Sequence, residues 1–208
     1  MKLVLFGAGG MIGSRLLAEA QRRGHAVTVV ARQPKKLGAL TGRVLVVQGD
    51  VLDAASVAAA VKGHDAVLSA VGPTPDIILG AARGLLEGLA RAGTRRLVVV
   101  GGAGTLEVAP GVLLLQTPQF PAEYEEIALA HRDALALLRQ NASLDWTFVS
   151  PAALIAPGER TGIFRLGGDQ LLVNGSGESR ISAEDFAVAF LDEVEKPRHL
   201  RRRFTVAY

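Results

Sequence analysis

A glycine-rich turn near the start of the chain is the strongest chemical signal in the sequence. Residues 7–13 are Gly-Ala-Gly-Gly-Met-Ile-Gly, and they follow a short apolar run and precede an amphipathic stretch. In this context Gly7 would permit a tight turn, Gly10 would let a diphosphate approach the backbone, and Gly13 would let a helix pack closely on the strand. The helix N-terminus would then offer free N–H groups to the phosphates. The sequence favours a dinucleotide site over a purely structural turn.

The residue at the end of the second apolar run indicates which dinucleotide would bind. A site for NAD usually has Asp or Glu there, about 20 residues beyond the glycines. This chain has Arg32 instead, with Lys35 and Lys36 close behind. A guanidinium group suits the 2′-phosphate of NADPH, so NADPH is predicted over NADH. The alternative is an ordinary exposed arginine at the end of a strand.

Two later segments fit the same cleft. Asp50 and Val51 follow the third apolar run, where they would bond to the adenine and flank it. Ala70, Val71 and Gly72 follow the fourth apolar run and would pass beneath the ribose. Because the carboxyl ends of parallel strands form the ligand crevice in such sheets, we expect both segments to lie beside the glycine turn.

The apolar runs predict the elements that position these motifs. Runs without polar alternation are typical of strands that helices cover on both faces. They occur at residues 2–6, 26–31, 44–48, 66–70, 96–100 and 146–149. Helical patterns lie between them at residues 11–23, 53–61, 75–92 and 122–139. This alternation predicts an α/β fold, a doubly wound and mostly parallel sheet in one domain over residues 1–208.

Two glycine-rich segments depart from this alternation. Residues 101–121 contain four glycines and three prolines. Loops of this length inside compact domains are usually functional, so a substrate-side lid is predicted there. Residues 150–208 are predicted to cover the ligand crevice, with a short strand at 170–173. In that region Ser182 would cap a helix in which Asp185 lies three positions on.

Composition narrows the possible classes of protein. The chain has 208 residues, of which 49% are hydrophobic and 21% charged, and it has no cysteine. Disulfides, thiolate metal sites and thiol nucleophiles are therefore excluded. No apolar run is long enough to span a membrane, and Gly7 interrupts the first run too early for a signal peptide, so we expect a cytoplasmic protein. The basic segment 196–203 lacks interleaved aromatic residues and is interpreted as a solvated loop, not as a nucleic-acid surface.

The motifs together resemble the NmrA-like atypical short-chain dehydrogenase/reductases over nearly the whole chain. The segments that carry the resemblance are 7–13, 49–51, 96–104, 144–151 and 179–182. Within that group the sequence is most similar to NAD(P)H-flavin reductases related to biliverdin-IXβ reductase. The resemblance implies a Rossmann fold that binds NAD(P). The cofactor contacts it implies are Gly7, Gly10, Met11, Ile12, Gly13, Arg32, Asp50, Val51, Ala70, Val71 and Gly72, with Pro151 and Ala152 beside the nicotinamide.

The usual catalytic residues of short-chain dehydrogenases are missing. Those enzymes use a serine after the fifth strand and a Tyr-x-x-x-Lys pair on the next helix, with the tyrosine protonating a carbonyl oxygen. Here Gly102 stands at the serine position, and Ile127 and His131 stand at the tyrosine and lysine positions. Tyr124 lies nearby but is followed four residues later by Ala128. Carbonyl reduction by the usual proton relay is therefore disfavoured.

Reduction of a flavin requires less of the protein, because the flavin accepts the hydride directly and the proton that follows can come from water. The predicted function is an NADPH-dependent oxidoreductase that reduces flavins or similar planar conjugated small molecules by direct hydride transfer. His131 and Tyr124 are the catalytic candidates, His131 as a proton donor or a partner of the nicotinamide ribose and Tyr124 as a lid residue. Packing is the alternative for both. A noncatalytic NADP(H)-sensing regulator and an epimerase or dehydratase remain as other functions, and monomer and homodimer are equally open.

Overall fold

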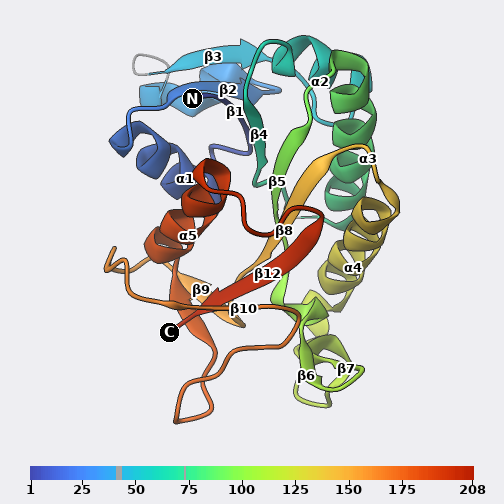
Figure 1. The fold of residues 1–208 in the computed structure, drawn as a ribbon, viewed down its shortest axis with the longest axis vertical. Coiled ribbons are helices and arrows are strands. Elements are labelled where there is room, and N and C mark those ends of the chain that lie inside the picture. The colour runs from blue at the N-terminus through green and yellow to red at the C-terminus, as the bar shows by residue number, and fades with distance from the viewer. Residues whose placement is uncertain (41–43, 73) are drawn as a thin grey trace.

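An eight-stranded sheet runs through the centre of the computed structural model, which describes residues 1–40, 44–72 and 74–208 (Figure 1). The strand order is β10-β12-β8-β5-β4-β1-β2-β3. The bounds are β1 Lys2–Phe6, β2 Ala26–Ala31, β3 Leu45–Gln48, β4 Ala66–Ser69, β5 Arg96–Val100, β8 Asp145–Ser150, β10 Arg165–Gly167 and β12 Arg202–Ala207. Among these strands β10 alone pairs antiparallel, with β12. The predicted mostly parallel sheet is confirmed.

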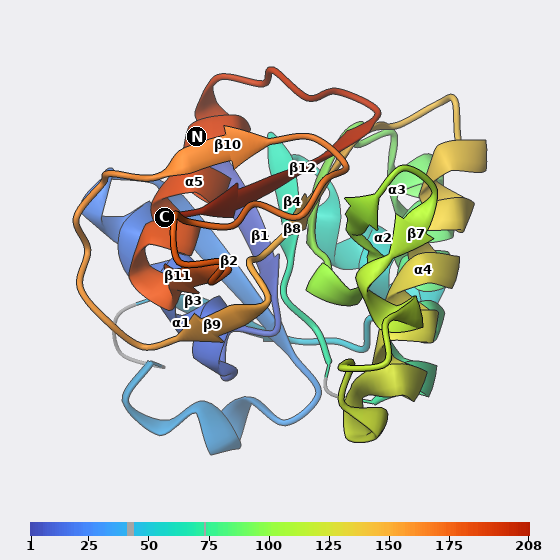
Figure 2. The same ribbon diagram turned by 90° about the horizontal axis from the view of Figure 1, so that it is seen from below.

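Helices cover both faces of the sheet (Figure 2). One face carries α1 (Met11–Arg22) and α5 (Ala183–Glu195), which pack against each other. The other carries α2 (Ala54–Val61), α3 (Pro75–Ala92) and α4 (Glu125–Gln140), which pack side by side in that order. This is the predicted doubly wound α/β arrangement. Within the described residues no helix is long and apolar enough to cross a membrane.

Two apolar cores lie on the two faces of the sheet. Leu3 and Leu5 of β1 belong to the core under α1 and α5, whereas Val4 and Phe6 belong to the core under α2, α3 and α4. Successive side chains of a strand point to opposite faces, so a strand buried on both sides must be apolar at every position. Trp146 of β8 lies in the second core with 2% of its surface exposed.

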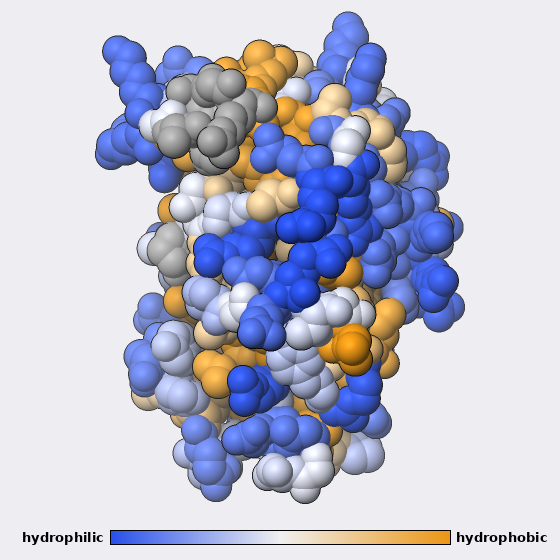
Figure 3. All heavy atoms as spheres, turned by 90° about the vertical axis from the view of Figure 1, so that its left-hand side faces the viewer, coloured by the Kyte–Doolittle hydropathy of each residue, from blue (hydrophilic) through white to orange (hydrophobic). Residues whose placement is uncertain are grey.

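Ion pairs tie α1, α5 and the segment before β10 together on the outside of the molecule. Glu19 of α1 is buried, and its carboxylate accepts from Arg160 Nε at 2.8 Å and from Arg23 Nε at 2.8 Å. The hydrogen bond from Arg160 is the main cause that lowers the pKa of Glu19 to about 2. Arg23 also donates to Asp192 and Glu195 of α5. Hydrophilic side chains form a broad band on this side of the molecule (Figure 3).

The segment 101–121 forms short regular elements beside α4. It contains a 3₁₀ turn (Ala103–Thr105), the hairpin of β6 (Glu107–Ala109) and β7 (Val112–Leu113), and a second turn (Leu114–Gln116). A third turn (Ala122–Tyr124) then leads into α4, where one continuous helix was predicted. Figure 2 shows the hairpin next to α4.

The predicted strand at residues 170–173 is wrong. The strand of this region is β10, and beyond it Gln170 makes a single bridge to Glu107. The backbone N–H groups of Glu107 and Leu171 donate to Asp169 and Glu107 respectively, which holds the chain in a short connection to the hairpin. Leu171 and Leu172 are therefore half-buried without pairing in the sheet, and Val173 is exposed.

The interpretation of segment 196–203 as a solvated loop is also wrong in part. Arg202 and Arg203 open strand β12, and the Arg203 side chain is 4% exposed. Its guanidinium donates to the carboxylate of Asp169 at 2.7 Å and to Thr105 O at 2.7 Å. These partners lie 34 and 98 residues away in the chain, so no local pattern indicates that the arginine is buried.

Candidate functional site

The turn between β1 and α1 needs glycine at two positions. Gly7 has a φ of +88°, and a Cβ atom there would lie 2.2 Å from Ala70 O at the end of β4. A Cβ atom on Gly13 would lie 2.0 Å from Gly7 O. Both contacts are far below the distance that real atoms allow, so only glycine lets β1, β4 and α1 approach this closely.

Gly10 is different, because space lies in front of it. It is the N-cap of α1, and no side chain caps the helix and no acidic residue occupies its first turn. The nearest atom to a Cβ on Gly10 would be Gly7 O at 3.5 Å, which is an ordinary contact. The uncapped N–H groups and the positive end of the helix dipole therefore face open space, an arrangement that suits a diphosphate.

A cleft of about 630 Å³ opens at the carboxyl ends of β1, β2, β4 and β5. This volume is in the usual range for a site that holds a cofactor. The cleft brings together predicted residues from six separate segments of the chain. They are Gly7, Gly10, Met11, Ile12, Arg32, Asp50, Val51, Ala70, Val71, Gly72, His131 and Pro151. Gly13 and Ala152 lie behind this lining as buried residues, and Tyr124 lies outside it.

One end of the cleft is polar and is formed by the ends of β2 and β3. Arg32 is exposed there, and none of the described residues pairs with its guanidinium. Asp50 is held by its own turn, since its Oδ1 accepts from Leu52 N at 3.0 Å and its N–H donates to Ser56 Oγ at 2.9 Å. The polar end thus presents a free cation beside a fixed carboxylate.

The other end, beside β5, β8 and α4, is largely apolar. It is formed by Val100 at the end of β5, Gly101 directly after it, His131 of α4, and Pro151 and Ile155 after β8. A Cβ on Gly101 would lie 2.0 Å from the ring of Phe148, so this glycine lets β5 and β8 pack beneath the cleft.

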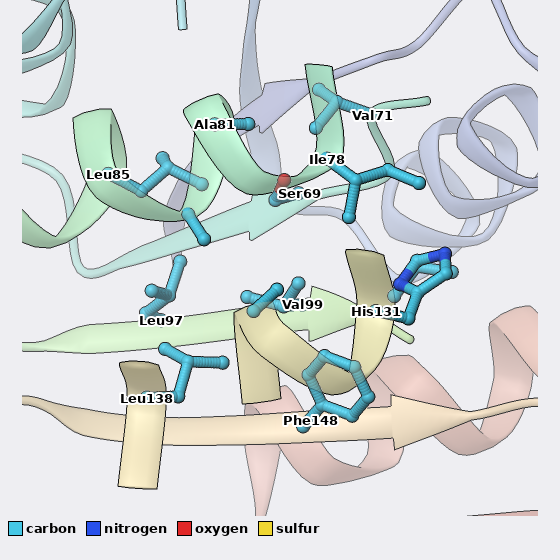
Figure 4. Close-up of a pocket in the computed structure, with 13 residues that line it drawn as sticks. Ser69, Val71, Ile78, Ala81, Leu85, Leu97, Val99, His131, Leu138 and Phe148 are labelled. Carbon is cyan, nitrogen blue, oxygen red and sulfur yellow. The ribbon is translucent and has the colours of Figure 1, made fainter. Parts of the chain in front are cut away.

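His131 lies between the cleft and a small internal cavity of about 20 Å³ under α3 and α4 (Figure 4). Its ring packs edge-on against Phe148, with the ring centres 6.2 Å apart. The Nδ1 atom is buried without a hydrogen-bond partner among the described residues. Burial lowers the pKa of His131 from 6.5 to about 4, because the protein cannot solvate an imidazolium there. At neutral pH the side chain is therefore uncharged.

The ring of His131 leaves no room for a side chain at residue 102, the predicted position of the usual serine. A Cβ atom on Gly102 would lie 2.8 Å from Cδ2 of His131. Tyr124, the N-cap residue of α4, has 55% of its surface exposed. Of the positions predicted for the usual serine, tyrosine and lysine, the first holds Gly102, the second Ile127 and the third an uncharged His131, while Tyr124 lies outside the cleft.

Several lining residues of the cleft were not predicted from the sequence, among them Leu37, Gly101 and Ile155. Leu37, in the turn Pro34–Leu40, lies over the glycine loop, with its Cδ2 3.1 Å from the place of a Cβ on Gly9. Gly101 and Ile155 line the apolar end. The close approach at Gly9 explains a glycine that the turn itself does not require, but nothing near Leu37 in the sequence indicates this contact.

Comparison with known proteins agrees with this geometry. A family model described as NAD(P)H-binding matches residues 7–195. The chain belongs to the NAD(P)H-binding family. The match covers the glycine loop, every wall of the cleft and α5. The resemblance to the NmrA-like atypical short-chain dehydrogenase/reductases is confirmed, and so is the expectation of a nicotinamide cofactor.

Three solved structures of relatives superpose over the whole length of this NAD(P)H-binding chain. A Burkholderia pseudomallei protein, provisionally described as exported, is 54% identical with a TM-score of 0.94, and each chain is covered completely. A Bacteroides thetaiotaomicron protein, provisionally described as an epimerase, is 41% identical with a TM-score of 0.93, covering 100% of this chain and 96% of that one. A Streptococcus pneumoniae protein, provisionally described as an NADH-flavin reductase, is 37% identical with a TM-score of 0.88, covering 100% and 99%.

The chain after β8 forms one wall of the cleft through Pro151 and Ile155. Strand β9 (Leu154–Ala156) pairs in parallel with β11 (Arg180–Ser182). Ser182 Oγ accepts from Asp185 N at 2.9 Å, which is the predicted cap of α5. Asp185 is buried and also accepts from Thr161 Oγ1 and from the hydroxyl of Tyr208. These bonds anchor the wall to α5 and to the end of β12.

Proposed function

We propose that the protein is an NADPH-dependent oxidoreductase that reduces flavins or similar planar conjugated acceptors by direct hydride transfer. The observation that carries the proposal is the apolar end of the cleft, where His131, uncharged at neutral pH, is the one titratable group among the described lining residues. A ketone would develop an alkoxide there without a protein acid to protonate it. An acceptor that receives a hydride and then takes its one proton from water does not need a protein acid.

Different residues of the cleft would bind different parts of the cofactor. The free N–H groups beyond Gly10 would hold the diphosphate, and Arg32 would hold the 2′-phosphate that distinguishes NADPH from NADH. When bound, NADPH supplies a hydride, and water supplies the proton that completes the two-electron reduction. Pro151 and Ile155 would exclude other water from the apolar end. His131 would orient the bound ring by packing and a neutral hydrogen bond.

The remaining parts of the proposal concern the substrate side. Residues 1–208 would act as a single domain in which segments 101–121 and 150–208 face the acceptor. Tyr124, exposed at the start of α4, would cover the acceptor and donate no proton. The relative described as an NADH-flavin reductase supports a flavin as acceptor. An epimerase is less well supported, because its usual tyrosine is replaced by Ile127.

Oxidation of NADPH, followed by its absorbance, tests the proposal with a panel of acceptors. We expect oxidation with FMN, riboflavin or a quinone, and little with simple aldehydes and ketones. The control is Gly10→Val, which places carbon atoms where the diphosphate would lie and should abolish turnover. If the protein binds NADPH and no acceptor oxidises it above the background rate, the reductase proposal is wrong and a regulator that senses NADP(H) takes its place.

A further inference from the structure

A second hollow, about 490 Å³ in volume, lies at the opposite end of β8 from the cofactor cleft. Pro151 follows the carboxyl end of β8 and lines the cleft, whereas Trp146 at the start of β8 lines this second hollow. Four arginines also line it, Arg139, Arg201, Arg202 and Arg203, and we call it the arginine pocket. It is remote from the glycine loop and is not needed for the proposed reaction.

Positive charge in the arginine pocket exceeds what the protein itself neutralises. Asp169 is the carboxylate of the lining, and it pairs with Arg203 and with Arg139 at 3.3 Å. Arg203 is buried and its guanidinium is fully used by Asp169 and Thr105. Arg201 and Arg202 are exposed, and none of the described residues forms an ion pair or hydrogen bond with their side chains.

The backbone at Arg201 adopts a conformation that this residue type avoids. Its φ is +56°, and among the described residues it is the only one other than glycine with a positive φ. The N–H of Arg201 donates to Trp146 O at 2.6 Å, which fixes this conformation at the start of β12. A left-handed arginine costs free energy that glycine would not, and such strain persists where it holds a side chain in place.

We propose that the arginine pocket binds a small polyphosphate anion through Arg201 and Arg202. Guanidinium groups match phosphate oxygens with paired donors, and the two unpaired arginines are consecutive residues of the lining. A hollow of this size admits a small anion. Nucleic acid fits less well, because neither aromatic ring of the lining is free to stack on a base: Trp146 is 2% exposed, and the His199 ring already stacks on Phe204.

Calorimetric titration with inorganic tripolyphosphate, at low salt and with NADPH at saturation, tests this proposal. Saturation with NADPH removes the glycine loop as a competing phosphate site. We expect binding that weakens at least tenfold in Arg201→Gly/Arg202→Gln, since a charge-assisted contact contributes about ten- to a hundredfold in affinity. Glycine suits the left-handed backbone, so this variant should fold at least as well as the parent, which circular dichroism checks.

The matched control is Lys62→Gln/Arg83→Gln, which removes two exposed positive charges far from the pocket. We expect this control to change the affinity less than twofold. Four outcomes would overturn the proposal: no binding by the parent, loss of binding when NADPH is present, equal weakening in both variants, or tighter binding of a short DNA duplex that depends on the same two arginines.

Discussion

The imidazole ring of His131 occupies the space that any side chain at residue 102 would need. A Cβ atom on Gly102 would lie 2.8 Å from Cδ2 of the ring, and the ring rests edge-on against Phe148. Residue 131 is at the lysine position of the usual triad and residue 102 at the serine position. The two residues are therefore coupled by steric exclusion, since His131 in its present position leaves no room for a Cβ atom at residue 102.

Replacement of Gly102 by serine should destabilise the protein, because the new Cβ must push His131 against Phe148. Overpacking of this kind costs about 1–3 kcal/mol in the free energy of unfolding. In a chain of this size each kcal/mol lowers Tm by about 2–4 °C. Gly175→Ser is the control, because nothing lies within 4 Å of a Cβ there.

The His131→Ala/Gly102→Ser double variant separates this cause from other effects of the serine. Removal of the ring should make the serine nearly neutral, so the two changes should couple by more than about 0.5 kcal/mol in denaturant unfolding. Additive effects, or a Gly102→Ser protein as stable as the parent, would show that the ring does not exclude the serine.

The lowered pKa of His131 predicts a pH dependence of stability. With a pKa of about 4 in the folded protein and 6.5 as its ordinary value, the unfolded chain binds more protons between those limits. Stability should therefore be complete above about pH 6.5 and fall as the pH drops towards 4, by up to about 3 kcal/mol from this group. Denaturant unfolding between pH 4 and 7 measures this loss.

The comparison that isolates His131 is the His131→Gln variant, which has no imidazole to protonate. Its stability should fall less steeply than that of the parent between pH 6.5 and 4. Glu19, with a pKa of about 2, loses its contribution in a different window, below about pH 4.5. Identical slopes for parent and variant above pH 4.5 would contradict the burial of the neutral ring.

Substitutions of two loop glycines should have different effects, one on cofactor binding and the other on folding. Gly10→Val should fold, because its Cβ meets nothing closer than 3.5 Å, and should lose NADPH binding in calorimetry. Gly13→Val should lower Tm strongly, because its Cβ would lie 2.0 Å from Gly7 O. Unchanged affinity in a folded Gly10→Val protein would remove the assignment of the diphosphate to this loop.

Arg32 should set the preference for NADPH. Its guanidinium has no partner among the described residues, so Arg32→Ala should cost little stability. The variant should bind NADPH about ten- to a hundredfold more weakly and NADH about equally well, since one charge-assisted contact is lost. Arg83→Ala, another exposed arginine, should leave both affinities unchanged. Equal affinity of the parent for both cofactors would end this interpretation.

Six strands of the sheet, the helices between them and the glycine turn were predictable from the sequence, because local chemistry determines them; β10 and β12 were not predicted. A strand covered on both faces is apolar at every position, as in Leu3 to Phe6, and this pattern is visible in a short window. Gly13 packs against Gly7 within the same turn, whereas the close approach of Gly7 is to Ala70 O, 63 residues away. The carboxyl ends of parallel strands lie at one edge of the sheet, so Arg32 and Asp50 could be assigned to the same cleft.

Tertiary structure alone decided the features that depend on distant partners. Leu37 reaches Gly9 across the cleft, and Arg203 is buried because Thr105 and Asp169 surround its guanidinium. The strand predicted at residues 170–173 lies at β10 instead, because the backbone of the later segment hydrogen-bonds to Glu107. The reason for glycine at position 102 is the ring of His131, 29 positions further along the chain; this steric exclusion acts through space and leaves no local pattern in the sequence.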